Sequence, residues 1–498
     1  MGNNISKNTI TSLILQLAIT IQGLIIPRFV LLYFGSSING LVSSLTQYLN
    51  LFAVFEGGVA GVILAALYKP VAENDWDKLS GILVSANGFM KKLGLMFVGY
   101  ALLLATVYPM FIDAYTWGFS FSLTVIISVT IFAQYYFTLI PQLLLRADDK
   151  FYLCNIVQLI FIVLNIIFAI ASVYIYPEIR FLKLLSSVAF FIQPIVLNIY
   201  INKYYKINWK ASHSKSLLGQ RWDGFGISLA NLITTNTDVI VLTAFTRLET
   251  VSVYTIYSQV LVAIRGLVNS VSNGFQAQIG QLYAKRDYEE LEKKFEVYEH
   301  LTNIVAGVLI TCCAQLIVSF VLLYTSGVED VNYNVPLFAF LITLSILFIC
   351  IREPYIQLTY CAGFFKETAQ YAYIEVVLNI VISIVLVIKL ELLGVAIGTI
   401  ISVLYRYIFT IIFIRKYILK RRIYFSLKQF AVEMSAFAVA YGISFCVVSV
   451  NANTFFLWIV KSFACLFVNI VVFFGIYMVF YRPLTQTLIE RIKSKIMT

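Results

Sequence analysis

Apolar residues recur in blocks of roughly 20 along almost the whole chain, and this pattern restricts the fold more than any other feature. A helix of that length spans a hydrocarbon core about 30 Å thick. Backbone groups in lipid must be hydrogen-bonded within their own segment, so we expect the blocks to be helices. Only 12% of the residues are charged, against about 25% in soluble domains. The sequence therefore predicts an all-α membrane protein.

Counting the blocks predicts about fourteen transmembrane helices. The expected centres are Ile21, Val54, Val98, Ile127, Val163, Phe191, Ala230, Gly266, Val308, Leu344, Val381, Leu404, Val439 and Val468.

The loops between these blocks alternate in charge, which predicts the orientation of the chain. Only four of the 36 Lys and Arg residues fall in the outer loops, namely Arg180, Lys183, Arg247 and Lys389. Because cytoplasmic loops carry an excess of Lys and Arg, both termini are expected in the cytoplasm. The chain would then be a multi-pass protein of a plasma membrane. Its net charge of +11 reflects these basic loops and does not indicate a nucleic-acid partner.

The linkers leave no room for a catalytic domain, so we do not expect an enzyme. The outer loops are about a dozen residues or fewer, whereas a domain needs at least about 50. The inner linker 281–300 places Leu291, Phe295 and Tyr298 at helical spacing, which is typical of an interfacial helix on the cytoplasmic surface. Its plainer role, and the favoured one, is to join two spans. Both histidines, His213 and His300, lie in inner linkers and are expected to be solvated.

An internal repeat divides the chain. The stretch 72–79 (AENDWDKL) matches 284–291 (AKRDYEEL), and 163–167 (VLNII) matches 377–381 (VLNIV) at nearly the same offset. The repeat is six spans long, which predicts two parallel six-helix lobes that enclose a central cavity. We therefore expect a lobe over residues 1–210, a second over 211–428, and two additional helices with a cytoplasmic tail over 429–498.

Four charges fall inside the first two spans of each lobe: Arg28, Glu56, Asp238 and Arg265. A charge deep in a span costs at least about 2.5 kcal/mol, so it usually faces a cavity or a partner. The forked guanidinium groups of Arg28 and Arg265 suit a pyrophosphate. Glu56 and Asp238 are candidates for gating or for binding a proton or sodium ion. The plainer alternative is that these residues form ion pairs within each half.

The remaining intramembrane charges are weaker signals. Arg352, Glu375 and Glu433 are placed near cytoplasmic ends, where exposure at the interface would explain them. Lys461 is expected to snorkel to the outer surface. Arg406 either faces the interior of the C-terminal half or reaches the inner surface.

Short motifs from the first span to the twelfth resemble the polysaccharide-unit flippases of the multidrug/oligosaccharidyl-lipid/polysaccharide (MOP) exporter superfamily. Their order along the chain carries the resemblance more than any single motif. The motifs are Arg28 with Gly35, Phe55–Gly58, Tyr68–Pro70, Asn236–Asp238, Val251–Tyr254, Ala362–Thr368 and Gly394–Thr399.

This resemblance implies two six-helix lobes around a cavity with alternating access, in which cationic residues are a recurring feature. It implies movement of undecaprenyl-pyrophosphate-linked repeat units of O-antigen, capsule or similar glycans to the outer leaflet. The expected partners are that lipid-linked oligosaccharide and bilayer lipids, with a polysaccharide polymerase and glycosyltransferases as further candidates. No cofactor is expected beyond a coupling ion, H⁺ or Na⁺. A cation-coupled multidrug exporter, a membrane glycan polymerase and a lipid II-type flippase remain as alternatives.

Overall fold

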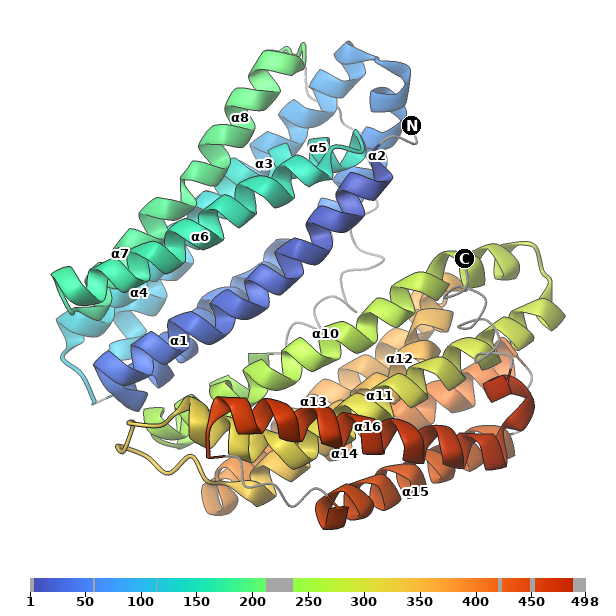
Figure 1. Ribbon diagram of the computed structural model, residues 1–498. Helices are drawn as coiled ribbons and strands as arrows, with labels where there is room; N and C mark the ends of the chain where they lie inside the picture. Colours follow the sequence, from blue (N-terminus) through green and yellow to red (C-terminus); the bar gives the residue numbers. More distant parts are fainter. Residues whose placement is uncertain are drawn as a thin grey trace. The chain divides into compact units, whose positions relative to one another are not determined.

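The computed structural model describes residues 4–56, 59–112, 114–211, 236–419, 423–447 and 453–486, and in these residues all regular structure is helical. The chain divides into two compact units, Met1–Ser252 (unit 1) and Val253–Thr498 (unit 2). Each unit is a bundle of long helices (Figure 1). The predicted all-α fold is confirmed.

Twelve helices in the described part of the chain are long and apolar enough to cross a membrane. The break in α1 accounts for one of the two further spans expected from the sequence. The other is centred on Ala230, which lies outside the described residues, and the short apolar helix Asn236–Phe245 follows it in the chain. The elements are α1 (Ile5–Asn50), η1 (Leu51–Glu56), α2 (Val59–Glu73), α3 (Trp76–Val107), η2 (Tyr108–Met110), α4 (Trp117–Ala133), η3 (Gln134–Thr138), α5 (Leu139–Ala147), α6 (Phe151–Ile175), α7 (Ile179–Phe190), α8 (Ile192–Tyr204), α10 (Leu248–Ala284), α11 (Tyr288–Tyr324), α12 (Pro336–Cys361), α13 (Phe365–Leu390), α14 (Leu392–Tyr417), α15 (Ile423–Val447) and α16 (Phe455–Phe480).

Helix α1 consists of two segments joined at Gly35. This residue has φ 83° and ψ 172°, a backbone conformation that glycine adopts without a steric cost. Before the break, α1 runs alongside α6 in the same direction. The side chain of Asn8 accepts a hydrogen bond from the backbone N–H of Tyr152 (2.7 Å), and the far ends of the two helices also pack together.

After Gly35 the chain runs the opposite way and packs antiparallel to α3. The hydroxyl of Tyr108 donates to Ser44 Oγ (2.7 Å), while further along the segment Phe52 packs edge-to-face on Phe97 (5.2 Å). One glycine therefore separates two of the spans that the sequence predicts. Helix α2 then continues this second span.

One span of unit 1 contains a change of helix type. Helix α4 passes into a π-helical turn, Gln134–Thr138, and then into α5 without leaving the helical path. A π-turn contains one extra residue compared with the regular α-helix and is often found at functional positions. Most residues of α5 are buried in the core of unit 1.

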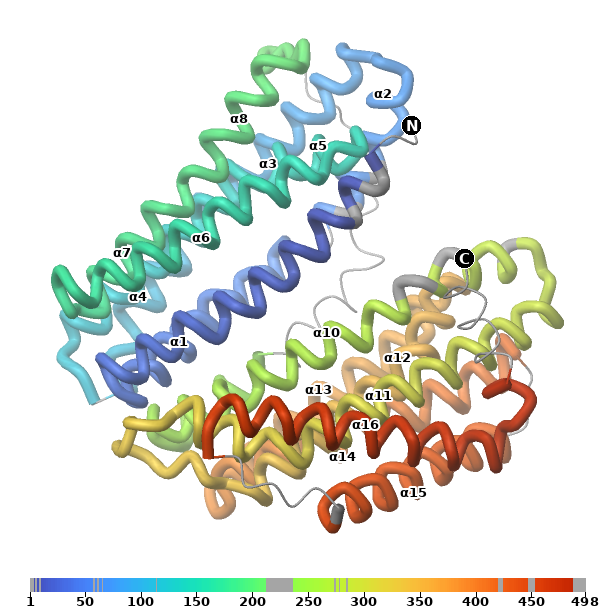
Figure 2. The backbone as a smooth tube through the Cα atoms, in the orientation of Figure 1, coloured from blue at the N-terminus to red at the C-terminus, as the bar shows by residue number. Residues whose placement is uncertain are grey.

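Unit 2 is organised around the 37-residue helix α11 (Figure 2). Leu291, Phe295 and Tyr298 are all fully buried in its first turns. Their helical spacing was predicted correctly, but the interfacial helix was wrong. Phe295 packs against Tyr355 of α12 (5.5 Å), so this apolar face contacts protein and not the membrane surface.

The prediction for His300 is also wrong. Its side chain is 1% exposed, and its Nε2 lies 3.1 Å from Thr485 Oγ1. The rings of Tyr477 and Tyr481 pack edge-on against the imidazole. The sequence placed His300 in a linker, whereas α11 carries it into the interface with the end of α16. His213 lies outside the described residues.

The internal repeat recurs in the local structure of both units. Asp75 caps the start of α3 and Asp287 caps the start of α11, each accepting a hydrogen bond from the backbone N–H three residues further on (3.1 and 3.2 Å). The residues before the caps, Asn74 and Arg286, have φ of 54° and 60°. The same turn thus begins the third and ninth spans.

The second pair of repeat anchors also occupies equivalent positions. The side chain of Asn165 on α6 accepts from Ser186 on α7 (2.5 Å), and that of Asn379 on α13 donates to Thr399 on α14 (3.1 Å). Both asparagines are buried and link their helix to the next one in the chain. The two sequence matches therefore correspond to matched structural roles.

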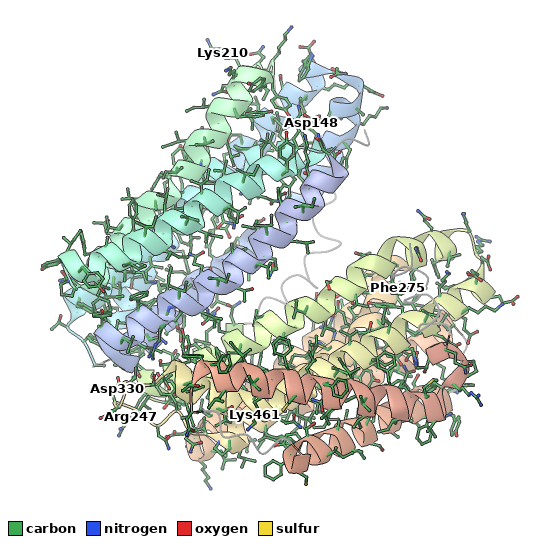
Figure 3. All side chains as sticks on the ribbon, viewed as in Figure 1. Asp148, Lys210, Arg247, Phe275, Asp330 and Lys461 are labelled. Atoms are coloured by element: carbon green, nitrogen blue, oxygen red, sulfur yellow. The ribbon has the colours of Figure 1, made fainter. Side chains whose placement is uncertain are left out.

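The domain boundaries expected from the sequence stay predictions. The boundary at residues 210 and 211 lies directly before residues 212–235, which are outside the described residues. The additional helices expected over 429–498 correspond to α15 and α16 in unit 2. Within unit 1, Asp148 and Lys210 lie at one end of the bundle and Arg247 at the other, as the alternation of loops predicts (Figure 3).

Three helical segments of unit 1 meet closely at the end opposite Asp148. Asn39 Nδ2 donates to Ser252 Oγ (2.8 Å), and Thr243 Oγ1 donates to Ser44 Oγ (2.9 Å). Between these bonds the backbone of Gly40 approaches Leu248 so closely that an added Cβ would lie 1.8 Å from the Leu248 carbonyl oxygen. Small residues at helix contacts of this kind are what allow backbones to pack closely in membranes.

We expect Gly40→Ala to destabilise the protein by about 1–3 kcal/mol, because the new methyl group collides with backbone that cannot rotate away. The thermal unfolding midpoint of the detergent-solubilised protein measures the change. Gly99→Ala is the matched control, since a Cβ there meets nothing within 4 Å. Equal midpoints for both variants would contradict the close approach.

Candidate functional site: a buried cationic cluster

The four charges singled out in the sequence lie in different units. Arg28 on α1, Glu56 at the end of η1 and Asp238 on the helix Asn236–Phe245 belong to unit 1, whereas Arg265 on α10 belongs to unit 2. Asp238 is buried, and the other three are half-buried. Their convergence on one cavity stays a prediction. Gly57 and Gly58, which follow Glu56, lie outside the described residues.

Three charges that were assigned to the membrane interface or left open are instead buried inside unit 2. Arg352 on α12, Glu375 on α13 and Arg406 on α14 are 6%, 0% and 5% exposed. Glu433 on α15 is also fully buried. The interface explanation is therefore wrong for Arg352, Glu375 and Glu433, and Arg406 takes the interior position of its two alternatives.

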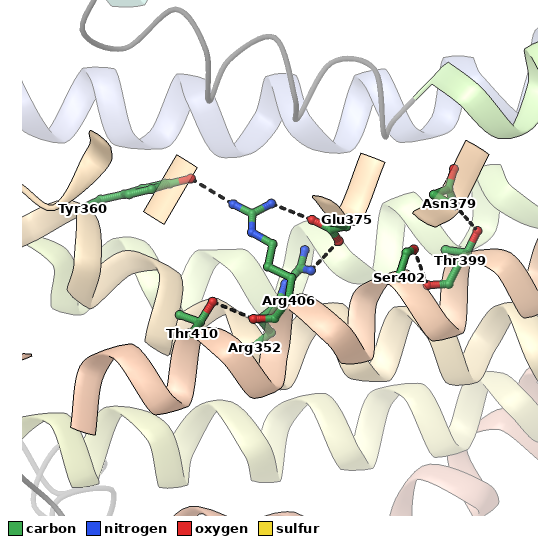
Figure 4. Close-up of polar contacts among 8 residues, drawn as sticks. All are labelled: Arg352, Tyr360, Glu375, Asn379, Thr399, Ser402, Arg406 and Thr410. Atoms are coloured by element: carbon green, nitrogen blue, oxygen red, sulfur yellow. Dashed lines mark hydrogen bonds and ion pairs between the residues drawn. The ribbon is translucent and has the colours of Figure 1, made fainter. Parts of the chain in front are cut away.

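Arg352, Glu375 and Arg406 form one ionic cluster (Figure 4). Arg352 Nη1 donates to Glu375 Oε1 (2.5 Å), and Arg406 Nη1 donates to Glu375 Oε2 (2.8 Å). Each carboxylate oxygen thus has its own arginine. Arg406 Nη2 also donates to the hydroxyl of Tyr360 (3.3 Å).

The helices hold this cluster in place with local hydrogen bonds. Arg406 lies midway along α14, where its carbonyl oxygen accepts a bond from Thr410 Oγ1 (2.7 Å). One helical turn from Glu375, Asn379 is bonded to Thr399 and so fixes α13 against α14. The two oxygens of the Glu375 carboxylate therefore face arginines from two different helices.

The cluster has more positive than negative charge. One carboxylate faces two guanidinium groups in the triad itself. Arg265 of α10 lies within electrostatic range of Arg352 and adds a further positive charge.

Guanidinium donors also remain unsatisfied. The Nε atoms of Arg265 and Arg352 are buried with no hydrogen-bond partner among the described residues. A buried donor without an acceptor costs about 1–3 kcal/mol, more when it is charged. An anion with several oxygen acceptors would complement both the excess charge and guanidinium donors of this kind.

Sequence reasoning identified Arg265 but missed the ion pairs of Glu375 with Arg352 and Arg406. The sequence signal was that three consecutive apolar spans each contain a charged residue, two of them arginines and one a glutamate. This signal was missed because each charge was interpreted only by its distance from the end of its own helix. Pairing the charges of neighbouring spans with each other, rather than with solvent, would have found the cluster.

No family model and no curated protein sequence matches this chain. Solved structures do match. The inward closed conformation of the lipid II flippase MurJ has a TM-score of 0.72 at 16% identity and covers 96% of this chain and 99% of its own. The chain therefore has the fold of a multi-pass membrane transporter, and its fold is similar to that of MurJ.

Two multidrug transporters share the fold over less of the chain. An inward-facing MATE family transporter of the MOP superfamily has a TM-score of 0.66 at 12% identity and covers 81% of this chain and 98% of its own. The MATE multidrug transporter DinF-BH has a TM-score of 0.62 at 14% identity, with coverages of 85% and 97%.

We expect Glu375→Gln to lower the stability of the protein by about 3–5 kcal/mol, because it leaves two arginines buried without a counter-ion. The unfolding midpoint in detergent measures the loss. Glu367→Gln removes an exposed acid from the first turn of the same helix and should have little effect. A Glu375→Gln variant as stable as Glu367→Gln would show that the arginines do not depend on this carboxylate.

Proposed function

We propose that this protein is a flippase. It moves undecaprenyl-pyrophosphate-linked oligosaccharide repeat units from the inner to the outer leaflet of a bacterial plasma membrane by alternating access, for the assembly of O-antigen or capsule-type polysaccharide. The observation that carries the proposal is the buried cluster in unit 2, with its excess of arginine and its unsatisfied guanidinium donors. The MurJ-like fold supports it.

The task requires a polar route through the bilayer. Sugar hydroxyls that entered hydrocarbon would lose their bonds to water without replacement, at a cost of several kcal/mol each in a medium that cannot hydrogen-bond. The polyprenyl tail has the opposite preference and stays in lipid. A pyrophosphate joins the two parts, so it is the one group that every such substrate presents at a fixed position.

Named residues take separate roles in this proposal. Arg265, helped by Arg28, holds the pyrophosphate with forked donors. Arg352 adds positive potential near Arg265, and Glu375 offsets part of the charge of Arg352 and Arg406. Glu56 and Asp238 serve in gating or in coupling to a proton or sodium ion. No residue is assigned a catalytic role.

The close contacts around Gly40 fit alternating access. In unit 1 they join the second span to the helix Asn236–Phe245 and the start of α10, and so close one end of that bundle. We infer that this end faces outward, with both termini in the cytoplasm.

The coverage of the fold ranks the alternatives. MurJ matches 96% of the chain, and the unmatched residues are too few to contain both α15 and α16. The match therefore includes at least part of these two helices. The MATE structures cover 81% and 85%. A flippase for lipid-linked saccharides is therefore favoured over a multidrug exporter, and lipid II itself is the second candidate substrate. A glycan polymerase would need catalytic groups that no observation supplies.

Reconstituted vesicles distinguish these substrates. We expect purified protein in liposomes to move undecaprenyl-pyrophosphate-linked repeat units between leaflets, measured as accessibility of the sugar to an enzyme added outside. Lipid II and an amphipathic cationic dye are tested in parallel. Movement of the dye with no movement of either saccharide lipid would overturn the proposal in favour of a multidrug exporter. Movement of lipid II alone would reassign the substrate.

Arg265→Ala should abolish the movement of lipid-linked repeat units between leaflets, because the pyrophosphate loses its main guanidinium partner. Insertion of the variant into the membrane should stay normal. In cells that depend on the protein, surface glycan should disappear. Arg415→Ala is the control, since it removes an exposed arginine at the end of α14. Normal glycan export by Arg265→Ala would refute the assignment of this residue. In vivo, a polymerase and glycosyltransferases are the proposed partners of the pathway.

A further inference from the structure

The additional helices α15 and α16 pack on α11 through a polar interface that the proposed function does not use. Two carboxyl groups lie inside it, Glu299 of α11 and Glu433 of α15, which are 1% and 0% exposed. None of the ion pairs found between described residues includes Glu433. Within the described part of the chain, this acid must therefore be stabilised without a salt bridge.

Glu299 is surrounded by hydrogen-bond donors. The hydroxyl of Tyr355 donates to its Oε1. With the amide of Gln429 oriented to suit its neighbours, its nitrogen donates to both carboxylate oxygens (2.9 and 3.0 Å), and its oxygen accepts from Asn303 (2.9 Å). A carboxylate that accepts several hydrogen bonds is stabilised in its charged form. Glu299 thus has the environment of an anion.

Glu433 has a different environment. The hydroxyl of Tyr477 bonds to its Oε2, but its Oε1 is buried with no hydrogen-bond partner among the described residues. Helix α11 packs closely against this oxygen at Gly307, where an added Cβ would lie 2.6 Å from it. A charged oxygen in this position would have no donor among the described residues.

The titratable groups that surround Glu433 do not supply a counter-charge. Tyr477 of α16 bonds to it, and Tyr407 of α14 interacts with both carboxyls. On α11, Glu299 is a second acid, so the two groups oppose each other's ionisation. His300 of α11 makes its Nε2 contact with Thr485 and packs on Tyr477 without reaching the carboxyl through any observed bond.

We propose that Glu433 is a buried proton-binding site: its carboxyl holds a proton at neutral pH and accepts a hydrogen bond from the hydroxyl of Tyr477 at Oε2, while Glu299 remains ionised. An isolated carboxylate in an apolar interior is strongly disfavoured, so such a group takes up a proton instead. The proton then neutralises the buried carboxyl between the helix pair α15–α16 and α11, which a metal ion or a basic side chain would otherwise have to do.

Infrared spectroscopy of the purified full-length protein at pH 7 tests this assignment. A protonated carboxyl has a C=O stretching band that an ionised carboxylate lacks. We expect the difference spectrum between wild type and Glu433→Gln to contain the loss of one such band. Glu299→Gln is the matched control and should instead lose the bands of an ionised carboxylate.

Loss of carboxylate bands in Glu433→Gln would overturn the proposal, as would a difference spectrum without a protonated carboxyl. If Glu433→Gln does not fold, Tyr477→Phe provides the second test. That variant keeps the acid but removes its hydrogen-bond partner, so the band of the protonated carboxyl should move to higher frequency. An unchanged spectrum in Tyr477→Phe would also reject the site. None of these results depends on the transported substrate.

Discussion

The structure of unit 2 depends on the cost of placing charge where water cannot reach it. Glu375 has a guanidinium group on each of its oxygens, and the two arginines come from helices on either side of it in the sequence. A buried pair of this kind adds little net stability compared with apolar residues of the same volume, but separating its members is expensive. The cluster therefore fixes the relative positions of α12, α13 and α14 more than it strengthens their packing. In a bundle with a purely apolar interior, fewer specific interactions would fix the register of the helices.

Much of the fold could be predicted from the sequence because the membrane imposes simple requirements on the chain. The length of each apolar block follows from the thickness of the bilayer, and the described helices lie where those blocks are. The repeat could also be found, since Asp75 and Asp287 perform the same capping task in each half and both require a short polar side chain. Such features depend on residues close together in the sequence.

The features that sequence reasoning missed depend on side chains that meet only in three dimensions. Glu375 and Arg406 are 31 residues apart, and His300 and Thr485 are 185 apart. A charge or an imidazole near the end of a span is compatible with exposure or with burial, and only its partners decide between them. The start of α11 illustrates the same ambiguity, because an apolar stripe on a helix suits a membrane surface as well as the side of a neighbouring helix.

The π-helical turn at Gln134–Thr138 has a consequence for the evolution of this chain. An extra residue in a regular α-helix rotates everything beyond it by about 100°, whereas a π-turn takes up the extra residue within the turn. The buried face of α5 therefore keeps the direction that a regular helix one residue shorter would give it. Loss of a single codon in this turn would restore regular geometry and leave that face in place, whereas loss of a codon elsewhere in the span would redirect every following side chain.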